Sequence, residues 1–191
     1  MLHAPCHPDQ FGCDDTLAPR HAYDPSRARA LLAEAGYSDG FRIELFAPSR
    51  DRHAVEAIVG YLRAVGIDAH LRTVEGGVVA EALRTGRAAF GVPTFGSSSI
   101  MDVAAGLSNF YAFGGDDITR DSEVRDLIVR GDRSLDPNVR TPAYAQALRL
   151  IVERVYGVPL NSVPVYYIAA DDLAFTPFSD EIPRFWEMRW R

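Results

Sequence analysis

Between residues 41 and 95, the spacing of apolar side chains alternates between the period of a strand and that of a helix. Residues 41–46 alternate apolar and polar side chains, which predicts a strand with one buried face. Residues 53–65 carry apolar side chains at helical spacing, and Gly66 follows where a left-handed cap would end the helix. The same reading predicts a strand over 67–72, a short helix around 78–83 that stops at Gly86, and a strand over 88–95. Strands separated by such helices pair in parallel, so the pattern predicts an α/β fold.

Helix-start signals flank this region on both sides. Asp24 before Pro25 predicts the N-cap and first turn of a helix that ends at Gly36. Asp136 before Pro137 predicts a longer helix. The apolar residues that would form its buried face are Tyr144, Ala145, Leu148, Ile151, Val152 and Val155. A shorter helix is predicted around Val124, Leu127 and Ile128.

The two ends of the chain lack such a regular pattern. Residues 1–22 contain several prolines and no periodicity, so we expect an extended lead-in to a body over 23–170. Residues 158–169 are rich in β-forming residues, but two prolines restrict them to an edge or broken strand. Residues 171–191 are rich in aromatic residues, which indicates a surface that packs on another part of the protein.

The composition of the chain argues against some classes of function. The chain has 191 residues and a net charge of −6, which argues against a nucleic-acid partner. Every basic residue is arginine, so chemistry that needs a lysine, such as a Schiff base, is excluded. No apolar run is long enough to span a bilayer, and the N-terminus lacks the features of a signal peptide.

The two cysteines, Cys6 and Cys13, are seven residues apart in a segment rich in proline and aspartate. A local disulfide, free thiols, and a metal site that includes His3 and His7 are the alternatives. The spacing matches no standard zinc pattern.

No catalytic set is evident in the sequence. His21, His53 and His70 belong to no catalytic motif, and each fits a surface or turn histidine better than a general base. The adjacent acids at 116–117 and 171–172 would point in opposite directions on a strand. We therefore expect no enzymatic activity, no cofactor and no bound metal.

A polar loop, 96–99, follows directly after the third predicted strand. Open α/β sheets bind ligands at the carboxyl ends of their strands, where backbone donors are free. A ligand site and an ordinary surface loop both fit this stretch.

Several segments, in the same order along the chain, resemble the extracellular solute-binding proteins of family 5, the peptide/nickel type that serves ATP-driven (ABC) importers. These segments are 23–37 with Gly40 and Phe41, 62–68, Asp136 and Pro137 with Arg140 and Tyr144, 158–160, and 172–177 through 180–185 to Trp190. The resemblance covers nearly the whole chain.

This resemblance implies a periplasmic-binding-protein-like (type II) lobe, with an open, mostly parallel sheet flanked by helices. The chain would be the C-terminal lobe, and residues 171–191 would return to an N-terminal lobe that is missing from this sequence. The parent protein would be periplasmic or extracytoplasmic, with its signal peptide in the missing part. The implied partners are a small-molecule or peptide ligand, the missing lobe and an ABC permease.

In this family the loop after the third strand faces the ligand cleft and commonly carries a Trp and an Asp-Pro pair. The ligand-binding residues implied here are Thr94, Phe95, Gly96, Ser97, Ser98, Ser99 and Asp102. Phe95 falls near the Trp position and Asp102 near the Asp of the pair, while Val103 replaces the proline. The carboxylate that holds a peptide's α-amine has no counterpart, so peptides, nickel chelates, sugars and opines all stay open as ligands.

Our first hypothesis is a solute-binding lobe that works by hinge closure around a ligand. Phe95 would stack on the ligand, the serines would hydrogen-bond to it, and Asp102 would orient the loop or a ligand cation. The alternative is the ligand-sensing lobe of an intracellular transcriptional regulator. A third hypothesis is a small enzyme with Cys6 or Cys13 as nucleophile, for which the sequence offers no partner base.

Overall fold

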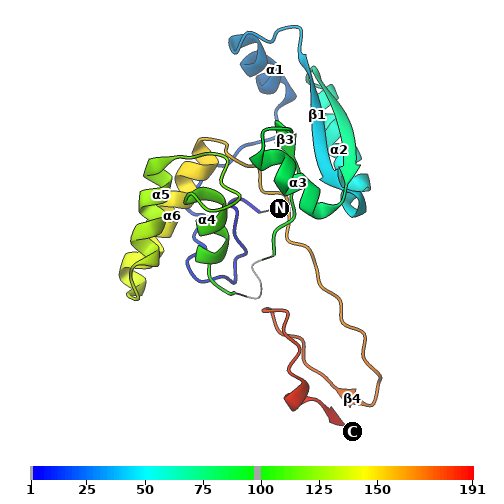
Figure 1. Cartoon of the computed structure of the whole chain (residues 1–191), viewed down its shortest axis with the longest axis vertical. Helices are drawn as coiled ribbons and strands as arrows, with labels where there is room; N and C mark the ends of the chain where they lie inside the picture. Colours follow the sequence, from blue (N-terminus) through cyan, green and yellow to red (C-terminus); the bar gives the residue numbers. More distant parts are fainter. Residues whose placement is uncertain (1, 97–99) are drawn as a thin grey trace. The chain divides into compact units, whose positions relative to one another are not determined.

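The computed structural model describes residues 2–96 and 100–191, and the chain divides into two compact units. Residues 21–95 and 115–118 form the first, which we call the sheet unit. Residues 1–20, 96–114 and 119–191 form the second, the helical unit. Both units are traced in Figure 1, and each is described by itself below.

A parallel sheet forms the centre of the sheet unit. The elements of this unit are α1 (Pro25–Glu34), β1 (Phe41–Pro48), the 3₁₀ turn η1 (Ser49–Asp51), α2 (Arg52–Arg63), β2 (Ile67–Val74), α3 (Gly76–Arg84) and β3 (Phe90–Gly91). The strand order is β2-β1-β3, and β1 pairs with both neighbours in parallel. The predicted α/β class and parallel pairing are confirmed.

The second half of β1 is buried on both faces. Leu45 and Ala47 pack with Val55 of α2, whereas Phe46 packs with Val79 of α3. Successive side chains on a strand point to opposite faces, so α2 and α3 cover opposite sides of the sheet. The prediction of one buried face therefore holds only for residues 41–44, where Arg42 and Glu44 are exposed. The sheet is thus flanked by helices on both faces, as the sequence predicts.

The predicted helix caps are present at both Asp-Pro pairs. Asp24 accepts a hydrogen bond from the Arg27 backbone N–H at 2.9 Å, and Pro25 opens α1. Asp136 accepts from the Asn138 N–H at 2.9 Å, at the start of α6.

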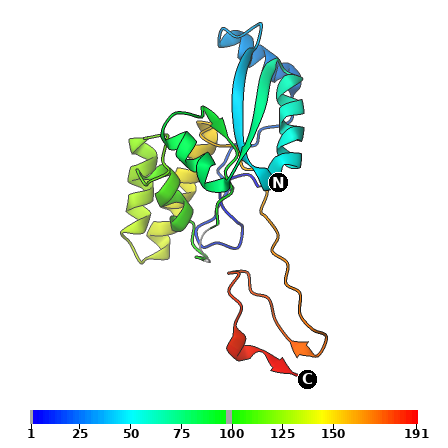
Figure 2. The same ribbon diagram turned by 45° about the vertical axis from the view of Figure 1, so that its right-hand side comes forward.

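Three helices form the core of the helical unit and lie side by side in Figures 1 and 2. The elements of this unit are α4 (Ala104–Tyr111), α5 (Ser122–Asp132), α6 (Pro137–Glu153), β4 (Leu173–Ala174), the 3₁₀ turn η2 (Phe185–Glu187) and β5 (Arg189–Trp190). The largest side chains buried among the three helices are Leu107, Val124, Ile128, Tyr144, Leu148 and Ile151.

The N-terminal residues 2–20 contain no helix and no strand beyond one isolated bridge. Ala4, Cys6 and Ala18 are nevertheless buried in the core of the helical unit. The division into lead-in, body and tail stays a prediction.

Three predicted features differ in the structure. The third strand is confined to two residues of the predicted 88–95, Phe90 and Gly91, which pair with Leu45 and Phe46 of β1. Val155 is exposed instead of buried, since its φ of 53° turns the chain away after α6. Residues 158–169 form no strand, and most of their side chains are exposed.

Within the described ranges, no helix combines the length and the apolar character needed to cross a membrane.

Two glycines make a close contact at the start of the sheet. Gly40 has a φ of 73°, and a Cβ at this position would lie 1.9 Å from the Gly66 carbonyl oxygen. Gly36 has a φ of 88°, but the space around its Cα is open. A residue with a Cβ would be strained at both position 36 and position 40, because both have positive φ, but only position 40 also lacks room for the Cβ.

We predict that Gly40→Ala destabilises the protein by at least about 2 kcal/mol, because strain adds to a clash that forces β1 and β2 apart. Gly36→Ala, the matched control, should cost about 1 kcal/mol from strain alone. Urea unfolding of both variants measures the difference. Equal losses would contradict the close approach.

Asp121 links the start of α5 to the end of α6. Its carboxylate accepts hydrogen bonds from the Glu123 N–H at 2.9 Å and from the Tyr156 hydroxyl at 2.7 Å, and it forms an ion pair with Arg154. The hydrogen bond from Tyr156, followed by that from Arg154, lowers the pKa of Asp121 from 3.8 to about 2.

Because the folded-state pKa is below the ordinary value, Asp121 contributes stability above pH ~4 that is lost as the pH falls toward 2. We predict that Asp121→Asn lowers the unfolding free energy at pH 6, and that the deficit relative to wild type shrinks by about 1 kcal/mol between pH 6 and pH 3. Urea unfolding at pH 6 and pH 3 tests this. A deficit independent of pH would show that Asp121 does not titrate as described.

Candidate functional site: the carboxyl edge of the sheet and the segment after β3

Two helices begin at the carboxyl edge of the sheet. β1 ends at Pro48 and leads through η1 into α2, and β2 ends at Val74 just before α3. Backbone N–H groups at a helix N-terminus have no partner within the helix and carry partial positive charge. This edge therefore presents hydrogen-bond donors from two helices.

Polar side chains from two strand ends meet at this edge. The Thr94 hydroxyl donates a hydrogen bond to Asp51 Oδ2 at 3.1 Å, and Arg50 Nε lies 3.7 Å from the same oxygen. Asp51 is the N-cap residue of α2, but its carboxylate accepts no capping hydrogen bond from that helix. Ser49 donates to the Val74 carbonyl at 3.3 Å and so ties the ends of β1 and β2 together.

Sequence reasoning selected Thr94 and missed Asp51. The available signal was position: Asp51 stands between a buried strand and an amphipathic helix, where α/β sheets place ligand-binding residues. Phe95 follows Thr94, and its side chain is 47% exposed. Gly96 lies next in the chain, whereas Ser97, Ser98 and Ser99 lie outside the described residues.

Asp102 belongs to the helical unit, where it has two partners. Arg140 Nη2 donates to Asp102 Oδ2 at 2.6 Å, and the Ala104 N–H donates to Asp102 Oδ1 at 2.9 Å. The second bond satisfies a free donor at the start of α4. Arg140 was noticed in the sequence only as part of the family pattern.

The Asp102–Arg140 pair continues into a hydrogen-bonded network between helices. Arg140 donates to the Tyr144 hydroxyl at 3.1 Å, and that hydroxyl donates to Asp132 Oδ1 at 2.8 Å. Ser108 donates to the other oxygen of Asp132 at 2.7 Å. Burial of Tyr144 raises its pKa to about 12, so the phenol stays protonated at any physiological pH. The network ties α4, α5 and α6 to the segment around Asp102.

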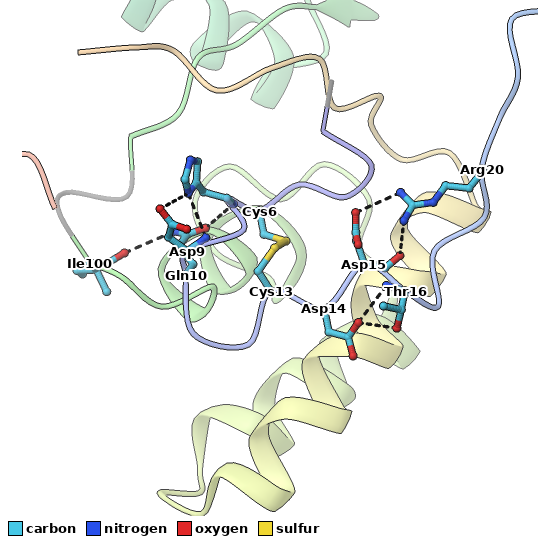
Figure 3. The surroundings of a disulfide bond; sticks show 10 residues. Cys6, Asp9, Gln10, Cys13, Asp14, Asp15, Thr16, Arg20 and Ile100 are labelled. Atoms are coloured by element: carbon cyan, nitrogen blue, oxygen red, sulfur yellow. Dashed lines mark hydrogen bonds and ion pairs between the residues drawn. A yellow bond between two sulfur atoms is a disulfide. The ribbon is translucent and has the colours of Figure 1, made fainter. Parts of the chain in front are cut away.

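Of the three states left open for the cysteines, the structure has the disulfide. Cys6 and Cys13 are bonded to each other and close a loop in the helical unit (Figure 3). The described part of the chain contains no group of His, Cys, Asp and Glu side chains that could hold a metal ion.

A surface hollow of about 310 Å³ lies elsewhere in the sheet unit, between α2 and β2. Its lining residues are Arg52, Glu56, Val59, Arg63, Leu71 and Thr73. Arg52 Nε donates to Glu56 at 2.8 Å, so two of its charges compensate each other. None of the predicted ligand-binding residues lines this hollow.

Comparison with known protein families shows which family the chain belongs to. The model of the bacterial extracellular solute-binding proteins, family 5 (middle), matches residues 2–117, more than half of the chain. The chain belongs to this family. The family predicted from the sequence is thus confirmed, and it is a family of binding proteins. A comparison with curated proteins gives no match.

Several solved structures share the fold of this chain. HbpA2 from Haemophilus parasuis matches all of this chain with a TM-score of 0.80 at 21% identity. DppA from Helicobacter pylori, in complex with the peptide STSA, matches 80% of it with a TM-score of 0.68 at 22% identity. NikA from Brucella suis, in complex with Fe(III)-EDTA, matches 80% with a TM-score of 0.65 at 22% identity. The chain spans 40% of HbpA2, 31% of DppA and 34% of NikA.

For this family 5 protein, we predict that Thr94→Val lowers the unfolding free energy by about 1 kcal/mol, because it removes the hydroxyl donor to Asp51. Thr94→Ser keeps the donor and serves as the matched control. Chemical denaturation of the two variants measures the difference. A Ser variant as destabilised as the Val variant would argue against the hydrogen bond.

Proposed function

We propose that this chain is part of the substrate-binding component of an ABC importer, which captures a small solute and delivers it to a membrane permease. The family match over residues 2–117 carries the proposal. We further propose that the chain is the C-terminal lobe and that the ligand is enclosed between it and an N-terminal lobe. A hinge motion would close the two lobes around the ligand.

The proposed ligand surface in the sheet unit is the carboxyl edge formed by Asp51, Thr94, Phe95 and the N-terminus of α2. Phe95 has a half-exposed ring on which an apolar or planar part of a ligand could stack. Asp51 and Thr94 offer a carboxylate and a hydroxyl beside it, at 3.1 Å from each other. Such a mixture of one aromatic group and a few polar groups is typical of small-molecule sites. Ser97, Ser98 and Ser99 stay a prediction from the sequence.

Asp102 lies in the helical unit, and we propose for it a role within its own segment. Its carboxylate is engaged by Arg140 and by the start of α4, which favours the orienting role over direct contact with a ligand cation. The ligand charge would instead be set by groups at the sheet edge, where Asp51 and Arg50 have opposite charges.

The disulfide supports an extracytoplasmic location. Disulfides persist mainly in oxidising compartments such as the periplasm and the cell exterior. This favours a transport protein over the sensing lobe of an intracellular regulator. Cell fractionation tests the location, and an intact protein that remains in the cytoplasm and binds DNA would contradict transport.

The first experiment is native mass spectrometry of the intact protein, purified gently from its own compartment. A co-purified small molecule would identify the ligand class. Titration with the peptide STSA and with Fe(III)-EDTA, the ligands of two relatives, should accompany it, with small-angle scattering to detect closure. The absence of closure with every solute class tested would contradict the proposed mechanism.

We predict that Phe95→Ala weakens binding of the identified ligand by about tenfold, or about 1.4 kcal/mol, through loss of aromatic contact area. Tyr61→Ala is the matched control, because Tyr61 is a similarly exposed aromatic residue on the last turn of α2, away from the carboxyl edge. Isothermal titration calorimetry measures both. Unchanged affinity in Phe95→Ala would show that Phe95 does not contribute to ligand binding.

A further inference from the structure

The outer edge of β2 has no neighbouring strand among the described residues. β2 is the first strand in the order β2-β1-β3, and all eight of its residues pair with β1. Natural proteins usually shorten or cover their edge strands, because free N–H and C=O groups form a template for another strand. The edge of β2 is therefore long enough to pair with an added segment of chain.

Alternate residues of β2 turn their backbone groups to this free edge. The Ala69 carbonyl accepts a hydrogen bond from Arg63 Nη2 at 3.3 Å, which places the backbone groups of Ala69 on the side away from β1. A strand repeats every two residues, so Leu71 and Thr73 present their N–H and C=O groups at the edge as Ala69 does. Arg72, between them, presents its groups to β1.

A surface hollow of about 310 Å³ lies beside the same edge. Its lining comes from α2, which Figure 2 shows alongside the sheet, and from β2, and the residues are Arg52, Glu56, Val59, Arg63, Leu71 and Thr73. None of these lining residues belongs to β1, so the hollow lies over the outer strand. Val59 is buried and Leu71 partly buried, which gives the hollow an apolar floor. Alternate side chains of an added strand would point into it.

Two arginines lie near the ends of the hollow. Arg52 and Arg63 are the first and last residues of α2, about 16 Å apart along the helix axis. Their side chains are 62% and 56% exposed. Arg52 donates to Glu56 and Arg63 to Ala69, and a guanidinium has five N–H donors, so each retains donors for a carboxylate. Acidic side chains four residues apart on an extended chain are separated by about 13 Å, which suits this spacing.

We propose that the free edge of β2 and the adjoining hollow form a docking site for an extended, acidic peptide segment of a partner protein, which adds to the sheet as a fourth strand. Its backbone would hydrogen-bond to Leu71 and Thr73. One apolar side chain would pack on Val59, and carboxylates two residues to either side would meet Arg52 and Arg63. The site lies within the sheet unit and does not depend on the proposed solute binding.

The first test needs no partner. Hydrogen exchange of the intact chain, followed for single amides by NMR, should be fast at Leu71 and Thr73. It should be at least about tenfold slower at His70 and Arg72, whose N–H groups face β1. Equal protection of all four amides would show that the edge is not free and would overturn the proposal.

The second test uses a blocked heptapeptide as probe, in which threonine alternates with aspartate, valine and aspartate. We expect a dissociation constant below about 1 mM and slower exchange of the Leu71 and Thr73 amides in its presence. The same peptide with every amide N-methylated keeps all side chains and should not bind. Replacement of both aspartates by lysine should weaken binding about fivefold. No binding of the probe, or equal binding of either modified peptide, would overturn the proposal.

Variants of the protein locate the docking site. Thr73→Pro removes an N–H from the edge and should abolish binding of the probe, whereas Thr73→Val, the matched control, keeps this donor. Arg63→Gln should weaken binding several-fold and provides a second variant if Thr73→Pro fails to fold. Arg27→Gln is its control, because Arg27 is an exposed arginine of α1 that pairs with Glu34. Equal affinities in variant and control would contradict the site.

Two further measurements separate this site from other occupants and surfaces. Phe95→Ala should leave the affinity for the probe unchanged. A loss of affinity would place the probe at the proposed ligand surface and overturn the edge site. Sedimentation of the chain without probe should show no self-association through this edge. A dimer that Thr73→Pro abolishes would show that a second copy occupies the edge, which would overturn the acidic partner.

Discussion

Burial of β1 on both faces is the constraint on which the sheet unit depends. Leu45, Phe46 and Ala47 are successive residues of one strand, and all three are buried. Because their side chains point alternately to the two faces, a helix is needed on each side. The connections that supply α2 and α3 start at the carboxyl ends of β1 and β2, so both helix N-termini lie at the same edge. The location of the proposed ligand surface is therefore a consequence of how the core is covered.

In the helical unit, segments without regular secondary structure are held in one conformation. Residues 2–20 and 101–103 contribute no helix and almost no strand, yet they pack on α4, α5 and α6. Hydrophobic burial alone is non-directional and gives such segments no unique conformation. A unique conformation comes from directional hydrogen bonds, in the network through Arg140, Tyr144 and Asp132 and in the Phe11 bridge, and from the covalent link of the disulfide.

Much of the fold was predictable because its signals are local. The caps at Asp24 and Asp136, the turn at Gly66, and the helical spacing of apolar residues each act within a few positions of the chain. The length of β3 was not predictable in this way, because it depends on pairing with β1, a strand distant in the sequence, and this pairing is limited to Phe90 and Gly91. The contact between Asp51 and Thr94 joins residues 43 positions apart, and that between Asp102 and Arg140 joins residues 38 apart. Spacing along the sequence carries no signal for either pair.

The residues that stabilise the fold differ from those proposed to contact the ligand. Side chains such as Leu45 and Tyr144 are fully buried, and replacing them removes contacts on which folding depends. Thr94 and Phe95 lie in the segment after β3, and both are exposed, so they contribute little to the core and can change without loss of the fold. Relatives that share this fold are accordingly found with ligands as different as the peptide STSA and Fe(III)-EDTA. If the proposed ligand surface is the binding site, solute preference follows from the few exposed groups at the carboxyl edge, and it can change while the buried residues that specify the fold stay the same.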